Sequence, residues 1–309
     1  MSNLLDDWHA RDRAEAEQWA AAPASRVELS KPDTVQPIAA FSPSGFKATV
    51  AWIKDGFSSV GYDLDAVRNG EASVPRISYA AFPHDLHQVA QTEERKALFL
   101  GFLLPFVLEA NGKVRQQRDR IERLRNELTY SDDIDENDVE WLQGMFAEYK
   151  VDPGNFPLLL RRVDTVPPSL ALAQSAVESG WGTSRFAREG NAAFGQWTTA
   201  EFKGIVPENR EDGKDHKIRA FDDLRESVES YLRNLNTHRA YTDFRKLRAE
   251  QRRTEGTVDS IALAAALTRY SQSGDEYVTL LRRIISGNKL RALDRARLGN
   301  TVVALRPGA

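Results

Sequence analysis

The segment Pro167-Pro-Ser-Leu-Ala-Leu-Ala-Gln-Ser-Ala-Val-Glu-Ser-Gly-Trp-Gly182 predicts a helix that the rest of a domain must surround. Pro168 and Ser169 suit the first turn of a helix, and Gly180 suits its C-terminal exit. At 100° per residue, the apolar side chains between these ends wrap more than half of the circumference. We therefore expect this helix to be buried on most sides in a globular domain.

One narrow polar stripe remains on the predicted helix, formed by Gln174, Ser175 and Glu178. A cleft wall is one reason for a buried helix to keep a carboxylate there. Glu178 falls in the last turn, where the helix dipole disfavours an anion, and burial beside Trp181 acts in the same direction. A raised pKa would suit a general acid near neutral pH, although an ordinary surface glutamate remains the alternative.

Composition removes several other kinds of chemistry. The 309 residues are enough for about two domains, and 42 basic against 45 acidic residues give a net charge of −3, which argues against non-specific nucleic-acid binding. The absence of cysteine excludes disulfides, thiolate catalysis and cysteine metal sites, and the five histidines form no zinc motif. There is also no phosphate-binding glycine loop and no Gly-x-Ser-x-Gly elbow. We therefore expect neither a metal nor a cofactor.

The chain divides by pattern into an arm (1–45), a helical N-terminal region (46–150), a second unit (151–300) and a tail (301–309). The arm has room for at most one short helix. Residues 93–128 are helical in pattern, and their apolar block 97–108 is shorter than the roughly 20 residues that span a bilayer. Because Pro105 interrupts this block, we expect a buried helix pair and no membrane span. Residues 131–138 lack the glycine of a calcium loop and instead predict the first turn of a helix.

The second unit begins after Asp152-Pro-Gly154 and contains one hairpin signal, Asp212-Gly213 between the β-prone runs 203–206 and 217–221. Asp223 and Glu226 resemble a capping box that opens a helix. The apolar spacing predicts buried positions on this helix at Leu224, Val228, Tyr231, Leu232 and Leu235. Further helices are predicted near 258–269 and 275–286. The expected fold class is α+β, mainly α.

Several motifs in this unit together resemble the glucosaminidase domain of Bax-like bacterial envelope proteins, a branch of the peptidoglycan β-N-acetylglucosaminidases. The general family pattern is carried by Ala176-Val-Glu-Ser-Gly-Trp-Gly182 and Asn191-Ala-Ala-Phe-Gly195. The closer likeness rests on Leu159-Leu-Arg-Arg-Val-Asp164, Gly195-Gln-Trp197, Gly204-Ile-Val-Pro207, Arg219-Ala-Phe221 and Arg233-Asn-Leu-Asn-Thr-His238. It extends from about residue 75 to 298.

The resemblance implies a lysozyme-like helical domain with a small β-hairpin lobe. It also implies that Glu178 is the general acid that cleaves the β-1,4 bond after N-acetylglucosamine in peptidoglycan. Glu208 is the nominee for a second catalytic acid, and the alternative is nucleophilic help from the acetamido group of the sugar. Glu211, Asp212 and Asp215, on or near the same hairpin, are expected to be solvated turn acids.

Tyr270 matches a family tyrosine beside the scissile sugar, with a packed structural tyrosine as the alternative. Phe194 and Trp197 are expected to stack on sugar faces, although either can be a core residue. Gln174 and Gln196 complete the predicted substrate-binding set.

Two other functions stay open at this point. A glycan-binding scaffold would keep the acid without an effective partner, and a lytic transglycosylase would also work with one glutamate. A peptidoglycan substrate implies the periplasm or cell envelope. The first 25 residues have no apolar core of a secretory signal, so export would depend on a leader that this sequence does not show.

Overall fold

The structure of the protein is a computed structural model. It describes residues 47–303 except residues 78, 131–133, 199–202 and 207–216. The expected arm, the Asp212-Gly213 turn and residues 304–309 lie outside the described residues.

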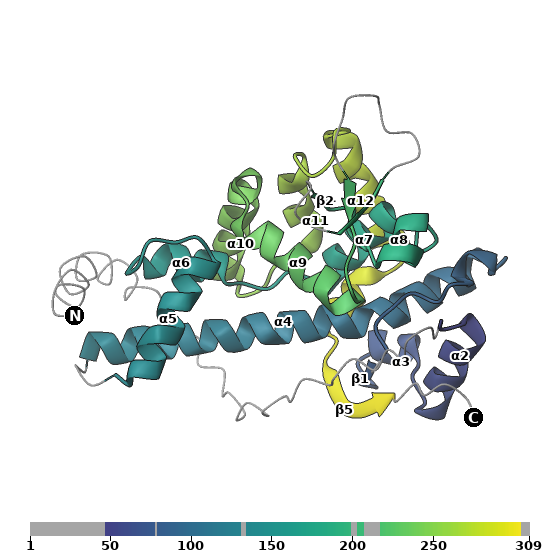
Figure 1. Ribbon diagram of the computed structural model, residues 1–309, viewed down its shortest axis with the longest axis horizontal. Helices are drawn as coiled ribbons and strands as arrows, with labels where there is room; N and C mark the ends of the chain where they lie inside the picture. The colour runs from purple at the N-terminus through teal and green to yellow at the C-terminus, as the bar shows by residue number, and fades with distance from the viewer. Residues whose placement is uncertain (1–46, 78, 131–133, 199–202, 207–216, 304–309) are drawn as a thin grey trace. The chain divides into compact units, whose positions relative to one another are not determined.

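The described part is mainly helical with two small sheets, as Figure 1 shows, and this confirms the α+β, mainly α fold class. The α-helices are α2 (Val50–Ser59), α3 (Leu64–Arg68), α4 (Thr92–Tyr130), α5 (Glu136–Glu148), α6 (Phe156–Arg162), α7 (Pro168–Ser179), α8 (Arg185–Gly190), α9 (Leu224–Thr237), α10 (Thr242–Glu255), α11 (Ser260–Leu263) and α12 (Asp275–Gly287). The 3-10 helices are η1 (Leu86–Gln88), η2 (Arg239–Tyr241), η3 (Ala264–Leu267) and η4 (Leu290–Arg295). The strands are β1 (Val74–Ile77), β2 (Trp197–Thr198), β3 (Gly204–Ile205), β4 (Lys217–Arg219) and β5 (Leu298–Val303).

The described chain forms two compact units, whose limits differ from the domains expected from sequence. The smaller unit contains residues 116–163, and the larger contains residues 47–115 and 164–303. The expected boundary after residue 150 does not coincide with this division. The reason is that α4 continues without a break through residues 115 and 116, while α6 belongs to the smaller unit.

The smaller unit consists of the end of α4 together with α5 and α6. Asp135 caps α5 by accepting a hydrogen bond from the Asn137 backbone N–H at 2.8 Å, so the acidic run opens a helix as predicted. Leu142 and Phe146 of α5 are buried. The ring of Phe146 meets that of Phe156 edge-on, with centroids 5.3 Å apart.

The long helix α4 corrects one prediction. Pro105 lies inside a single continuous helix of 39 residues and does not divide it into a pair. The flanking residues Leu103, Leu104 and Val107 are fully buried, and their packing outweighs the hydrogen bond that proline removes. By length and composition alone α4 could cross a bilayer, and 72% of its most apolar 18-residue window is buried within the protein. Core helices of globular proteins share these properties, so they do not by themselves make α4 a membrane span.

The β lobe is a three-stranded antiparallel sheet in the order β2-β4-β3. Gly204 pairs with Arg219 and Ile205 with Ile218, which confirms the predicted hairpin of β3 and β4. The third strand, β2, pairs with the other edge of β4 and was not predicted. This lobe directly follows α8, so it begins close in sequence to the end of α7.

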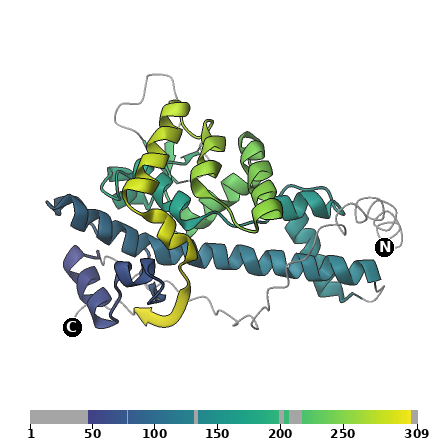
Figure 2. The same ribbon diagram turned by 180° about the vertical axis from the view of Figure 1, so that it is seen from behind.

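A second sheet joins the two ends of the larger unit. Strand β5 runs parallel to β1, and Val303 pairs with Ile77, 226 residues away in sequence. Figure 2 shows the yellow strand curving to lie beside the N-terminal elements. The first three residues of the expected tail, 301–303, therefore belong to a strand.

Helix α9 begins at the predicted cap. The Asp223 side chain accepts from the Glu226 backbone N–H at 2.9 Å. The Glu226 carboxylate accepts from the backbone N–H of Asp222, one residue earlier than in a standard capping box. All five predicted core positions of α9 are buried: Leu224, Val228, Tyr231, Leu232 and Leu235.

Candidate active site

Helix α7 is the buried centre of the larger unit, and Figure 1 shows it among α8, α9, α11 and α12. Its N-terminus is capped from outside the helix: Asp294 of η4 accepts from the backbone N–H and the hydroxyl of Ser169, both at 2.8 Å. Its C-terminus ends at Gly180, whose left-handed backbone (φ 57°, ψ 47°) is the helix exit predicted from sequence.

The turn that follows α7 is anchored on α4. Trp181 also adopts a left-handed backbone, with φ of 59°, and its ring meets that of Phe99 edge-on at 5.5 Å. A Cβ on Gly182 would come within 3.0–3.2 Å of Leu86, Phe99 and Phe82, so only glycine fits there without displacing this core. The packing of Trp181 and Gly182 fixes the last turn of α7, which carries Glu178.

Glu178 is a partly exposed residue in the last turn of α7. Burial raises its pKa from 4.5 to about 7, and a hydrogen bond from the Tyr277 phenol acts in the opposite direction by stabilising the anion. The carboxyl therefore holds its proton at higher pH than an ordinary glutamate does. This is the protonation behaviour predicted from the position of Glu178 at the helix end.

The backbone of Gly195 lies directly against this carboxyl. A Cβ placed on Gly195 would lie 2.6 Å from Oε2 of Glu178, and Gly195 has a left-handed φ of 58°. Both the space and the backbone conformation therefore require glycine. Because Gly195 lies two residues before β2, it brings the start of the β lobe close to Glu178.

Four tyrosines surround Glu178, contributed by α9, η2, the segment after η3, and α12. They are Tyr231, Tyr241, Tyr270 and Tyr277. In each, burial raises the pKa of the phenol, and the nearby Glu178 charge adds to the effect. The phenols thus stay protonated. Tyr231 donates its proton to Gln174, Tyr270 donates to the backbone carbonyl of Phe194, and Tyr277 bonds the Glu178 carboxylate.

Two predicted substrate-binding residues are core residues in this structure. Gln174 is completely buried, and its amide bonds two phenols: Nε2 donates to Tyr277 at 3.2 Å and Oε1 accepts from Tyr231 at 2.7 Å. Phe194 is 1% exposed and stacks on the ring of Tyr231 at 3.9 Å. Their burial leaves no face for a sugar to contact.

Tyr270 is partly exposed and lies in the phenol cluster with Glu178, so the structure brings these two predicted residues together. Its hydroxyl donates to the backbone carbonyl of Phe194 at 3.0 Å. Its ring is parallel to that of Tyr277, with centroids 5.7 Å apart. This geometry holds the segment before Gly195 against α12.

The other predicted site residues belong to the β lobe. Gln196 is partly exposed, and its backbone carbonyl accepts from Arg219 at 2.8 Å. Trp197 lies in β2 opposite Ile218, and its side chain lies outside the described part of the chain. Glu208 also lies outside the described residues, together with Glu211, Asp212 and Asp215. The structure therefore does not place a second catalytic acid.

Sequence reasoning missed Tyr277 and Tyr241 and treated Tyr231 only as a core position. No local pattern links Tyr277 to Tyr270, because a turn separates Tyr270 from the start of α12 at Asp275. Among the residues that the structure describes, no three His, Cys, Asp or Glu side chains come together as a metal site would require.

Comparisons with known proteins show the family to which the chain belongs. A family model, "Mannosyl-glycoprotein endo-beta-N-acetylglucosaminidase", matches residues 159–290, which include α7 and all four tyrosines. Protein bax of Escherichia coli (strain K12) is 32% identical over 211 residues, covering 66% of this chain and 74% of that protein. A solved structure, the catalytic domain of the autolysin Auto from Listeria monocytogenes, is 18% identical in sequence and has a TM-score of 0.32. The match covers 58% of this chain and 96% of that one, and its low TM-score carries no argument here. The chain therefore belongs to the Bax-like proteins with a glucosaminidase domain, a family of glycoside hydrolases.

Proposed function

We propose that this protein is a peptidoglycan hydrolase, an endo-β-N-acetylglucosaminidase in which Glu178 is the proton donor. The observation that carries the proposal is the partly exposed carboxyl at the end of α7, whose pKa burial raises to about 7. Membership of the glucosaminidase family supports the class of bond. We further propose that residues 151–300 form the catalytic domain and that the protein works in the periplasm or cell envelope, where peptidoglycan lies.

The proposed reaction begins when Glu178 donates its proton to the glycosidic oxygen as the bond to the anomeric carbon breaks. The next sugar leaves as an alcohol, and positive charge develops on the N-acetylglucosamine ring. Water then adds to the anomeric carbon and releases a proton, so one water molecule is consumed for each bond broken. Glu178 is ionised after the first step and can recover its proton as water adds.

Two groups are candidates for stabilising the positive charge on the sugar ring. Glu208 can supply a carboxylate from the β lobe. The alternative is the acetamido oxygen of the substrate, which would form a cyclic intermediate before water adds. Glu208→Gln separates these routes, since it would abolish cleavage in the first and leave most of it in the second.

The central test uses purified sacculi incubated with the wild type and with Glu178→Gln. We expect cleavage by the wild type, at least about a hundredfold less by the variant, and new reducing ends on N-acetylglucosamine. Equal cleavage by the two proteins would contradict the role of Glu178. Glu189→Gln, a change in the exposed acid at the end of α8, is the matched control and should cleave like the wild type.

The chemistry of the released ends separates the competing functions. Reducing ends on N-acetylmuramic acid would assign the other glycosidic bond. Anhydro ends, lighter by one water, would assign a lytic transglycosylase. Sacculus binding without any released ends would assign a scaffold.

A further inference from the structure

The buried polar groups behind Glu178 form one continuous chain of hydrogen bonds. The Tyr231 hydroxyl donates to Oε1 of Gln174 at 2.7 Å, and Nε2 of Gln174 donates to the Tyr277 hydroxyl at 3.2 Å. Tyr277 in turn bonds the Glu178 carboxylate. Tyr231 and Gln174 are 0% exposed and Tyr277 is 3% exposed.

The direction of each bond follows from the chemistry of the groups. A carboxylate can only accept, so Tyr277 must use its single proton toward an ionised Glu178. The Tyr277 oxygen is then available as an acceptor, and the amide nitrogen of Gln174 is the donor that occupies it. The Gln174 oxygen accepts the proton of Tyr231, which fixes the orientation of the amide.

This order matters because a hydroxyl can rotate. Without a donor on its oxygen, Tyr277 could turn its proton away from Glu178 toward any other acceptor. With Gln174 in place, the acceptor side of the phenol is already used and the proton points at the carboxylate. Donation to the oxygen of a hydroxyl also makes its own proton a stronger donor.

We propose that Gln174 and Tyr231 are positioning residues that act through Tyr277 to set the strength with which the Glu178 carboxyl holds its proton. This inference rests on the proposed function of Glu178 as the acid. The sequence predicted that Gln174 contacts the sugar. In this proposal Gln174 instead acts on Glu178 through its hydrogen bond to Tyr277.

The titratable groups that face Glu178 in the described part of the chain are all phenols. They are Tyr277 from α12, Tyr231 from α9, Tyr241 from η2, and Tyr270 from the segment after η3. The acids and arginines of α12 are exposed to solvent: Asp275, Glu276, Arg282 and Arg283. Asp294 of η4 lies at the opposite end of α7, where the charges of Arg291 and Asp259 influence its pKa.

Burial raises the pKa of the Tyr231 phenol and the positive charge of buried Arg248 in α10 acts to lower it, so Arg248 is counted among the charged groups around the hydrogen-bond chain. Neither Gln174→Met nor Tyr231→Phe changes any full charge in this set. A shift in the pKa of Glu178 would therefore report the hydrogen-bond chain.

The test is a titration of Glu178 followed by NMR in the full-length protein labelled with [5-13C]glutamate. The Glu178 signal is identified by its absence in Glu178→Gln. We expect Tyr277→Phe to raise the pKa by about one unit, the worth of a hydrogen bond to a charged group. Gln174→Met should raise it by roughly half a unit or more, and Tyr231→Phe by less, because it acts one bond further away.

Tyr149→Phe is the matched control, because it removes a buried phenol and its 2.9 Å bond to Gln117 in the smaller unit. It should leave the titration of Glu178 unchanged. A folded Gln174→Met protein with the wild-type pKa would overturn the inference. If Gln174→Met does not fold, Tyr231→Phe, which loses one oxygen atom, decides by the same criterion.

The titration contains no substrate, so it tests positioning independently of the proposed function. A wild type that fails to cleave sacculi would refute the function and leave this result standing. If none of the three substitutions changed the pKa of Glu178, the positioning role would be refuted and the proposed function would be unaffected.

Discussion

Burial of the Glu178 carboxyl makes the free energy of unfolding depend on pH. The folded pKa of about 7 lies above the unfolded value of about 4.5, so the folded state binds the proton more tightly. The stabilisation by the protonated carboxyl is complete below pH 4.5 and is lost as pH rises to 7. Above pH 7, the ionised group costs the fold about 3 kcal/mol relative to a neutral one.

Glu178→Gln mimics the protonated carboxyl at every pH. At pH 8 we expect the free energy of unfolding of the variant to exceed that of the wild type by about 2–3 kcal/mol. At pH 4.5 we expect the two free energies of unfolding to be equal. Urea unfolding at both pH values measures the difference. A variant that is less stable than the wild type at pH 8 would contradict a raised pKa.

Gly195 offers a second test at the level of one residue. Gly195→Ala places a methyl group 2.6 Å from Oε2 of Glu178, and we expect it to abolish cleavage and to lower the free energy of unfolding by about 2–4 kcal/mol. Gly61→Ala is the control, because Gly61 has a similar φ of 63° and open space around the added Cβ. It should lose only the roughly 1–2 kcal/mol of backbone strain and keep full activity. Equal effects of both substitutions would show that the contact with Glu178 is unimportant.

Among the elements, α7 shows what sequence can and cannot predict. Both of its ends were predicted from local chemistry, since proline and serine favour a start and glycine an exit. Its cap, Asp294, comes from 125 residues further along the chain, and no local pattern indicates it.

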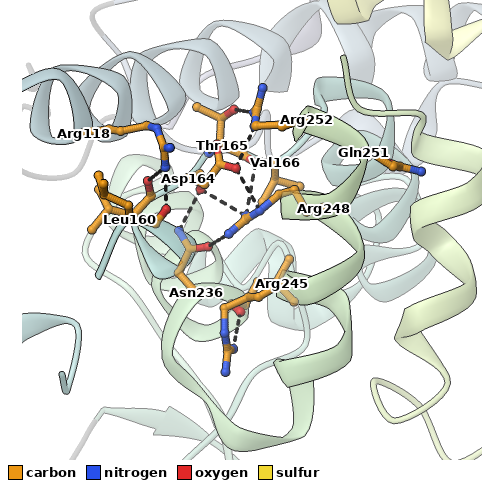
Figure 3. Close-up of polar contacts among 12 residues, drawn as sticks. Arg118, Leu160, Asp164, Thr165, Val166, Asn236, Arg245, Arg248, Gln251 and Arg252 are labelled. Atoms are coloured by element: carbon orange, nitrogen blue, oxygen red, sulfur yellow. Dashed lines mark hydrogen bonds and ion pairs between the residues drawn. The ribbon is translucent and has the colours of Figure 1, made fainter. Parts of the chain in front are cut away.

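Helix α10 was missed because its buried face is polar. Its buried residues are Phe244, Arg245, Arg248 and Gln251, so apolar periodicity is nearly absent. Figure 3 shows what replaces it: Arg248 donates to the backbone oxygens of Asp164 and Thr165 and to the Asn236 amide oxygen, and lies 3.3 Å from the Asp164 carboxylate. Long-range polar contacts of this kind hold α10 against α9 and the segment before α7.

This network predicts a large effect of one buried cation. Arg248→Met removes three donors to buried acceptors, and we expect a loss of about 3–5 kcal/mol in the free energy of unfolding. Arg252 still pairs with Asp164 at 2.7 Å, so the fold should survive at moderate temperature. Arg253→Met, on the exposed face of the same helix, should cost less than about 1 kcal/mol. Thermal or urea unfolding of the two variants checks the contrast, and similar losses would contradict a structural role for the buried network.

At the scale of the whole molecule, the sequence predicted the fold class and a raised pKa for Glu178, but not how distant segments meet. Pro105 indicated a break in α4, yet the apolar residues around it form one helix that runs through both units. The pairing of β1 with β5 joins residues more than 220 positions apart and leaves no local signal. The same holds for the site, since Glu178 was evident from one helix whereas its phenols come from four separate segments.

These phenols and the apolar surroundings give the molecule its expected pH dependence. If Glu178 must be protonated to act, the rate of cleavage depends on the fraction of the free enzyme that holds this proton. The pH profile of kcat/KM therefore reports directly on the carboxyl at the end of α7.

The decisive measurement is kcat/KM of the wild type on solubilised peptidoglycan strands between pH 4 and 9. We expect an alkaline limb centred near pH 7, with a tenfold fall for each further pH unit as Glu178 ionises. A rate that stays constant to pH 9, or that already falls above pH 4.5, would contradict Glu178 as the proton donor.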